Sequence, residues 1–86
     1  MNKKYKINKK FIIQKLDGKI VIFDGEKSVL NTLNSTATFM FQKIKVGWDK
    51  EKIVEAMIKI YSIDEKSVKK DFDTLIKELV KQKIIT

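Results

Sequence analysis

The feature that most constrains the fold is the dipeptide Asp17–Gly18, which stands between two short runs rich in β-branched and aromatic residues. The runs are FIIQKL at 11–16 and KIVIF at 19–23. Asp-Gly favours a two-residue type I′ turn, because both central residues of that turn need a positive φ. We therefore predict an antiparallel hairpin. A second turn, DGEK at 24–27, leads to SVLNTL at 28–33 and completes a three-stranded meander.

Three helices are predicted after the strands, each from a capping residue followed by apolar residues at spacings of three and four. The first is capped by Asn34 or Ser35 and ends near Val46–Gly47. Asp49 caps a second helix of about twelve residues, and Asp64 caps a third that ends near residue 82. Their expected buried faces are Ala37, Met40, Phe41 and Ile44, then Ile53, Ala56, Met57, Ile60 and Tyr61, and finally Val68, Phe72, Leu75, Ile76, Leu79 and Val80.

A three-stranded antiparallel sheet followed by three helices indicates an α+β fold with a winged-helix-like arrangement. The 86 residues suffice for one small domain, expected at 11–86, after a flexible basic arm at 1–10 with order only near Tyr5 and Ile7. The basic N-terminus is not followed by a long apolar segment, and no apolar run approaches the roughly 20 residues that span a membrane. We expect a cytoplasmic protein without a membrane partner.

The composition excludes the commonest catalytic and metal-binding side chains. There is no cysteine and no histidine, which rules out disulfides, thiol nucleophiles, imidazole bases and Cys/His zinc sites. The three glycines, Gly18, Gly25 and Gly47, stand apart and form no phosphate-binding loop. The carboxylates alternate with lysines, as on a solvated face. We expect no enzyme activity, no cofactor and no metal.

The net charge of +8 comes from 19 lysines without a single arginine. Arginine is the side chain that most often reads guanine edges, so the composition argues against nucleic acid as the partner. The charge serves solubility at least as well as it serves a polyanionic partner.

A set of motifs runs through the chain in a familiar order. It consists of Leu33–Asn34, Thr36–Ala37 and Phe41, then Gly47 and Asp49, the corner Tyr61 to Asp64, the helix positions Val68, Asp71–Phe72, Leu75 and Leu79, and the closing Lys83 to Ile85. With this pattern, residues 11–85 resemble the PqqD family of pyrroloquinoline quinone biosynthesis and the wider class of recognition elements for ribosomally made, modified peptides. Three positions depart from it, because Ser62 and Lys83 replace glycines and Glu65 replaces a frequent proline.

The resemblance implies a non-catalytic peptide-binding module, either a monomer or a weak homodimer. Family members hold the leader segment of a precursor peptide as a strand added to the third strand, in a groove completed by the third helix. They present it to a modifying enzyme, often a radical-SAM enzyme. The candidate peptide-binding residues are Ser28, Val29, Leu30, Asn31, Thr32 and Leu33 on the strand and Lys66, Lys69, Lys70, Phe72, Asp73, Ile76 and Lys77 on the helix.

Several of these roles have competing interpretations. Lys66, Lys70 and Lys77 form either a solvated face or a surface that attracts acidic leader residues. Phe39 and Trp48, which lie off the apolar stripes, either pack against a neighbouring loop or contact the modifying enzyme or a second copy.

The chief alternative function is that of a small winged-helix DNA-binding protein, which the pI near 9.7 and the lysine-rich third helix would suit. Asp71, Asp73 and Glu78 on the same helix oppose it. A purely structural subunit, with its sheet edge permanently paired to another chain, is a third reading.

Overall fold

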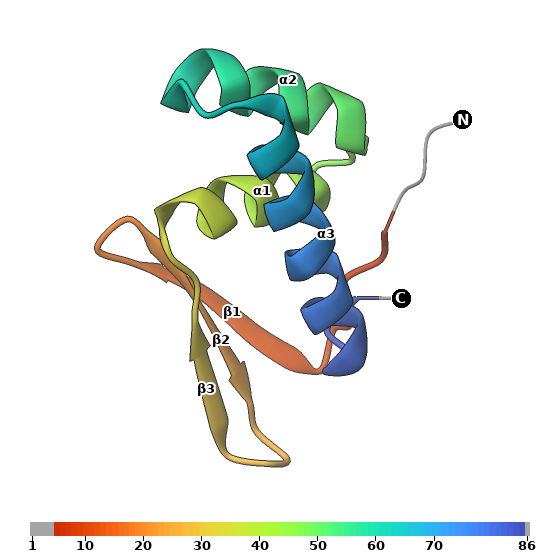
Figure 1. The fold of residues 1–86 in the computed structure, drawn as a ribbon. Coiled ribbons are helices and arrows are strands. Elements are labelled where there is room, and N and C mark those ends of the chain that lie inside the picture. Colours follow the sequence, from red (N-terminus) through yellow and green to blue (C-terminus); the bar gives the residue numbers. More distant parts are fainter. Residues whose placement is uncertain (1–4, 86) are drawn as a thin grey trace.

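The computed structural model describes residues 5–85 and has the predicted order of three strands followed by three helices (Figure 1). Residues 1–4 of the expected basic arm, and residue 86, lie outside the described part. The elements are β1 (Phe11–Leu16), β2 (Lys19–Asp24), β3 (Val29–Thr32), α1 (Ser35–Lys45), α2 (Lys50–Tyr61) and α3 (Glu65–Lys81). In Figure 1 the sheet lies at one end of the molecule, and α1 separates it from α2.

The sheet is an antiparallel meander in the order β1-β2-β3. Asp17 and Gly18 have φ values of 51° and 77°, which confirms the predicted turn with two positive φ angles. The third strand is shorter than the predicted run 28–33. Ser28 has a φ of 53° and belongs to the preceding turn, because a left-handed residue cannot continue an extended strand.

The two faces of the sheet differ in burial. Ile20, Ile22 and Asp24 of β2 are buried beneath the helices. Because side chains alternate along a strand, their partners in β3, among them Asn31, share the helix-facing side. Leu30 belongs to the opposite face, where its side chain is 61% exposed.

Each helix begins at a predicted cap. The side chains of Asn34, Asp49 and Asp64 accept hydrogen bonds from the backbone N–H groups three residues later. The helix ends turn through left-handed residues, and Ser62 and Lys83 adopt φ values of 54° and 63°. The two positions at which the chain lacks the family's glycines are therefore positions where glycine would be unstrained.

The predicted core is largely confirmed, with corrections at the helix rims. Ile22, Phe41 and Ile53 are completely buried. Ile60, Tyr61 and Val80 were expected inside but are 60%, 37% and 49% exposed, because a helix on the edge of a small bundle buries a narrower stripe than its apolar residues would cover. Two buried residues, Val54 and Thr38, were not anticipated.

The described part of the N-terminal segment runs beside the end of the chain. Ile7 forms an isolated antiparallel bridge with Ile85, and the Asn8 backbone N–H donates to the Ile84 carbonyl at 2.7 Å. The Asn8 side-chain amide also donates to the Lys83 carbonyl at 3.0 Å. These contacts, at the lower right of Figure 1, cover the helical end of the core.

Candidate functional site

The open edge of the sheet is the outer side of β3. The Leu33 N–H donates to the Ile20 carbonyl in β2 at 2.8 Å. Because backbone groups alternate in direction along a strand, Val29 and Asn31 also point toward β2, whereas Leu30 and Thr32 point outward. No strand of the described chain lies beyond β3. The N–H and C=O groups of Leu30 and Thr32 therefore offer two donors and two acceptors to an added strand.

Thr38 of α1 closes one end of the β2–β3 ladder. Its Oγ1 accepts a hydrogen bond from the Ile20 N–H at 2.9 Å and donates one to the Leu33 carbonyl at 3.2 Å. In a regular ladder those two backbone groups would bond to each other. The buried hydroxyl replaces that rung and ties the start of α1 to the sheet.

A second polar connection joins β3 to the end of α3. The Asn31 side-chain amide donates to Gln82 Oε1 at 2.7 Å, and Gln82 Nε2 donates to Glu78 Oε1 at 2.8 Å. These three side chains span the gap between the edge strand and the helix.

Just beyond the end of β3, a hollow of about 340 Å³ opens between α1 and α3, which we call the α1–α3 hollow. Its apolar lining comes from Ala37, Met40 and Leu75. Since Asn34 directly follows Leu33, and since Glu78 is linked to Asn31, the hollow is continuous with the open edge. Its complete lining is Asn34, Thr36, Ala37, Met40, Asp71, Thr74, Leu75 and Glu78.

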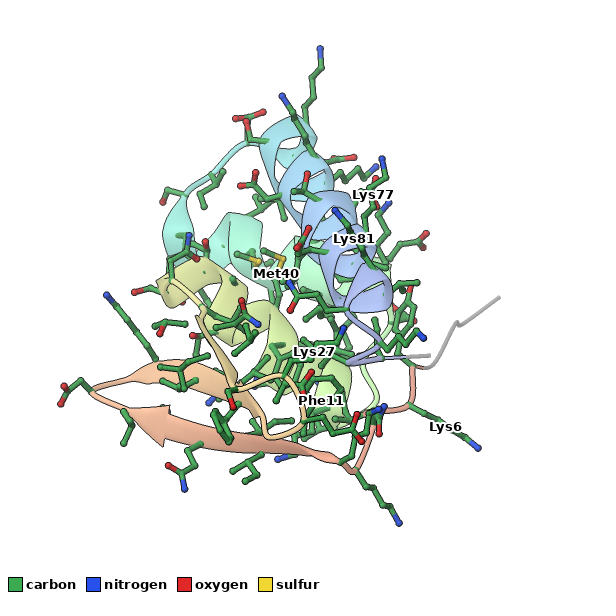
Figure 2. The ribbon with its side chains drawn as sticks, turned by 90° about the horizontal axis from the view of Figure 1, so that it is seen from below. Lys6, Phe11, Lys27, Met40, Lys77 and Lys81 are labelled. Carbon is green, nitrogen blue, oxygen red and sulfur yellow. The ribbon has the colours of Figure 1, made fainter. Side chains whose placement is uncertain are left out.

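Four of the candidate residues of α3 lie on a different side of that helix. They surround, together with Thr74, a separate shallow hollow of about 520 Å³, which we call the lysine hollow, lined by Lys66, Lys70, Asp73, Thr74 and Lys77. Lys77 projects from the side of α3 opposite to Met40 (Figure 2). Thr74 lines both hollows and marks the boundary between them.

The other three candidates of α3 do not reach β3 either. Lys69 faces α2 and pairs with Glu65 at 2.6 Å, a hydrogen bond and charge pair that raise the pKa of Lys69. Phe72 is buried in the core, and Ile76 packs half-buried against it. The structure thus brings the strand candidates together with one side of α3 and places the helix candidates on its other sides. Attraction of acidic peptides by the lysines stays a prediction.

Phe39 and Trp48 are half-buried at the junction of α1 and α2. Phe39 meets Tyr61 edge-on, with ring centroids 5.8 Å apart. The Lys43 ammonium lies 5.2 Å from the Phe39 ring and 4.7 Å from the Trp48 ring, and the Lys52 ammonium lies 4.4 Å from Trp48 on the same ring. These contacts favour a packing role. A role in partner contact stays a prediction for both residues.

Sequence reasoning missed the residues that line the α1–α3 hollow from α3. Asp71, Leu75 and Glu78 recur at spacings of four and three, which places them on one helix face. That signal was visible, but it identifies a face without saying which neighbour the face meets.

Comparison with known proteins places the chain. The family model of coenzyme PQQ synthesis protein D (PqqD) matches residues 19–85. Two solved structures share the fold. "TbiB1 in Complex with the TbiA(beta) Leader Peptide" has a TM-score of 0.83 and 20% identity over 93% of each chain. "Lasso peptide synthetase B1 complexed with the leader peptide" has a TM-score of 0.89 and 17% identity over 98% of this chain and 99% of that chain. No curated protein sequence matches. At these identities, the likeness to the two structures establishes the fold, and it confirms the predicted α+β class.

Proposed function

This chain belongs to the PqqD family, and we propose that it captures the leader segment of a ribosomally made precursor peptide as a fourth strand beside β3. Both similar structures are described as complexes with a leader peptide, which supports a peptide as the ligand here too. Neither description favours the DNA-binding alternative.

The observation that carries the proposal is the open edge of β3 and its continuity with the α1–α3 hollow. Leu30 and Thr32 offer the backbone groups that an extended peptide can pair with. Beyond Thr32, the same peptide would pass over Ala37 and Leu75, where the lining is apolar. Backbone pairing would provide general affinity, and the hollow would select side chains.

The interaction energies are sufficient for a useful complex. Four backbone hydrogen bonds contribute about 1 kcal/mol each. One or two apolar anchors in the hollow would add about 1.5–3 kcal/mol each. After the cost of ordering the peptide, a free energy near about −8 kcal/mol, which corresponds to micromolar affinity, is within reach.

The module itself would be non-catalytic and would hold the peptide for a separate modifying enzyme in the cytoplasm. Residues 11–86 would form the recognition domain. The absence of cysteine and histidine removes the side chains that most often carry out chemistry of their own. Phe39 and Trp48 are the proposed contacts to the modifying enzyme.

Calorimetry with the leader of the precursor peptide encoded beside this protein tests the proposal. Thr32→Pro removes an outward N–H of β3 and leaves the bonds to β2 intact, so we expect affinity to fall by about tenfold or more. The matched control is Lys15→Pro, which makes the same change on the outer edge of β1.

The control should bind within about twofold of the wild type, and thermal melting should show that both variants fold. A leader that binds Thr32→Pro as tightly as the wild type would exclude strand addition at β3. Salt-dependent binding to duplex DNA by a protein that ignores the leader would exclude the proposed function altogether.

A further inference from the structure

Two carboxylates flank the apolar floor of the α1–α3 hollow. Asp71 and Glu78 lie on either side of Leu75 along α3, and all three line the hollow. Seven residues of helix separate the carboxylates by about 10 Å along the axis. No lysine lines this hollow, although the chain has 19. The part of the groove that follows β3 is therefore acidic in a strongly basic protein.

These two carboxylates also differ from the others of α3 in what they bind. Glu65 pairs with Lys69, and Asp73 pairs with Lys50 at 2.8 Å. Within residues 5–85, by contrast, the Asp71 carboxylate has no ion pair or hydrogen bond. Glu78 accepts a hydrogen bond only from the neutral amide of Gln82. Neither negative charge in the hollow is compensated by a lysine of the described chain.

We infer that the peptide segment entering the α1–α3 hollow is basic, with lysine or arginine side chains that pair with Asp71 and Glu78 on either side of an apolar residue that contacts Leu75. The inference rests on the proposed function. It reverses the charge expected from the lysines of α3, which surround the neighbouring lysine hollow instead.

The geometry sets the spacing of the basic residues. An extended chain rises about 3.3 Å per residue, so side chains two and four residues apart on one face span about 7 and 13 Å. The roughly 10 Å between the carboxylates falls between these values, and the long stems of lysine and arginine adapt to the difference. We therefore expect two basic residues two to four positions apart.

Selection from a phage library of random ten-residue peptides tests this without knowledge of the natural precursor. The wild type should enrich peptides with paired lysine or arginine residues around an apolar residue. Asp71→Asn combined with Glu78→Gln should abolish that preference, since both amides keep the shape but carry no charge. The strongest basic peptide should bind this double variant about tenfold more weakly in a fluorescence anisotropy titration.

The matched control combines Glu51→Gln with Glu55→Gln on α2, which changes the net charge equally but outside the hollow. It should bind the same peptide within about twofold of the wild type. An equal loss in both double variants, a preference for acidic peptides or no charge preference would overturn the inference and leave strand addition standing. If the wild type enriches no peptide at all, the proposed function fails with it.

Discussion

β3 is joined to the helices at two places by a single polar side chain, and the two joints are built differently. At the corner with α1, the Thr38 hydroxyl is 4% exposed and bonds to backbone groups of two strands. Facing α3, Asn31 is half-buried and bonds only to the side chain of Gln82. Water can replace the second bond but cannot reach the first. The sheet and α1 therefore behave as one unit, whereas the gap between β3 and α3 opens at little cost, on the side where a peptide would enter.

Removal of the Thr38 hydroxyl should have the largest effect. Thr38→Val keeps the shape but leaves the Ile20 N–H and the Leu33 carbonyl without a partner in a buried site. We expect the free energy of unfolding to fall by about 2–4 kcal/mol, measured by urea denaturation. Thr74→Val is the matched control, because its hydroxyl donates to the Lys70 carbonyl on an exposed helix surface. A control that loses as much as Thr38→Val would show that burial is not the cause.

The turn that follows α3 provides the next largest effect. Lys83 has a φ of 63°, a conformation that costs a side chain about 1 kcal/mol relative to glycine. Lys83→Gly should raise the free energy of unfolding by about 0.5–1 kcal/mol, after the extra entropy of glycine in the unfolded chain. The neighbouring change Lys81→Gly, inside the helix, should lower it by about 1 kcal/mol. If both changes destabilise, the left-handed turn does not strain the end of α3 that carries Gln82.

Asp64 caps the other end of α3 and makes that end sensitive to acid. Hydrogen bonds from the hydroxyl and the backbone N–H of Ser67 lower the pKa of Asp64. A lowered pKa in the folded state stabilises the fold above the unfolded pKa of about 3.9, and this contribution is lost as the pH falls through the folded pKa. Asp64→Asn keeps a capping acceptor that does not titrate.

The urea midpoint of Asp64→Asn should therefore fall less steeply than that of the wild type below a pH of about 4. Parallel acid profiles for the two proteins would contradict this. Because Asp64 is far along α3 from Gln82, the variant also loosens the helix without touching either joint of β3.

The difference between the joints also explains what the sequence could and could not predict. Asp17–Gly18, Asn34 and Asp64 act through neighbours within four residues, so turn and cap chemistry identified them. The spacing of apolar residues on α3 gave its buried stripe. It could not give the rotation of the helix against its neighbours, which decides whether Lys70 or Asp71 faces β3.

Long-range polar contacts were beyond reach for the same reason. Asn31 and Gln82 are 51 positions apart, and nothing in either residue type names the other as its partner. Thr38 reads as one more small residue in a helix until the end of β2 is placed against it. The charge of the candidate groove was misjudged because it depends on that rotation, and the lysines outnumber the acids on α3.

The smallest effect is expected at the joint with α3, where it bears most directly on the comparison. Asn31→Ala removes one exposed side-chain hydrogen bond, and we expect the free energy of unfolding to change by about 0.5 kcal/mol or less. Gln82→Ala should behave alike, and a double-mutant cycle should give a coupling energy below about 0.5 kcal/mol. A coupling as large as the Thr38 effect would mean that β3 and α3 are locked together, and that a peptide must first break a stable contact. If the coupling is small, the leader should bind Asn31→Ala at least as tightly as the wild type, because the strand edge remains and the bond that spans the gap is gone.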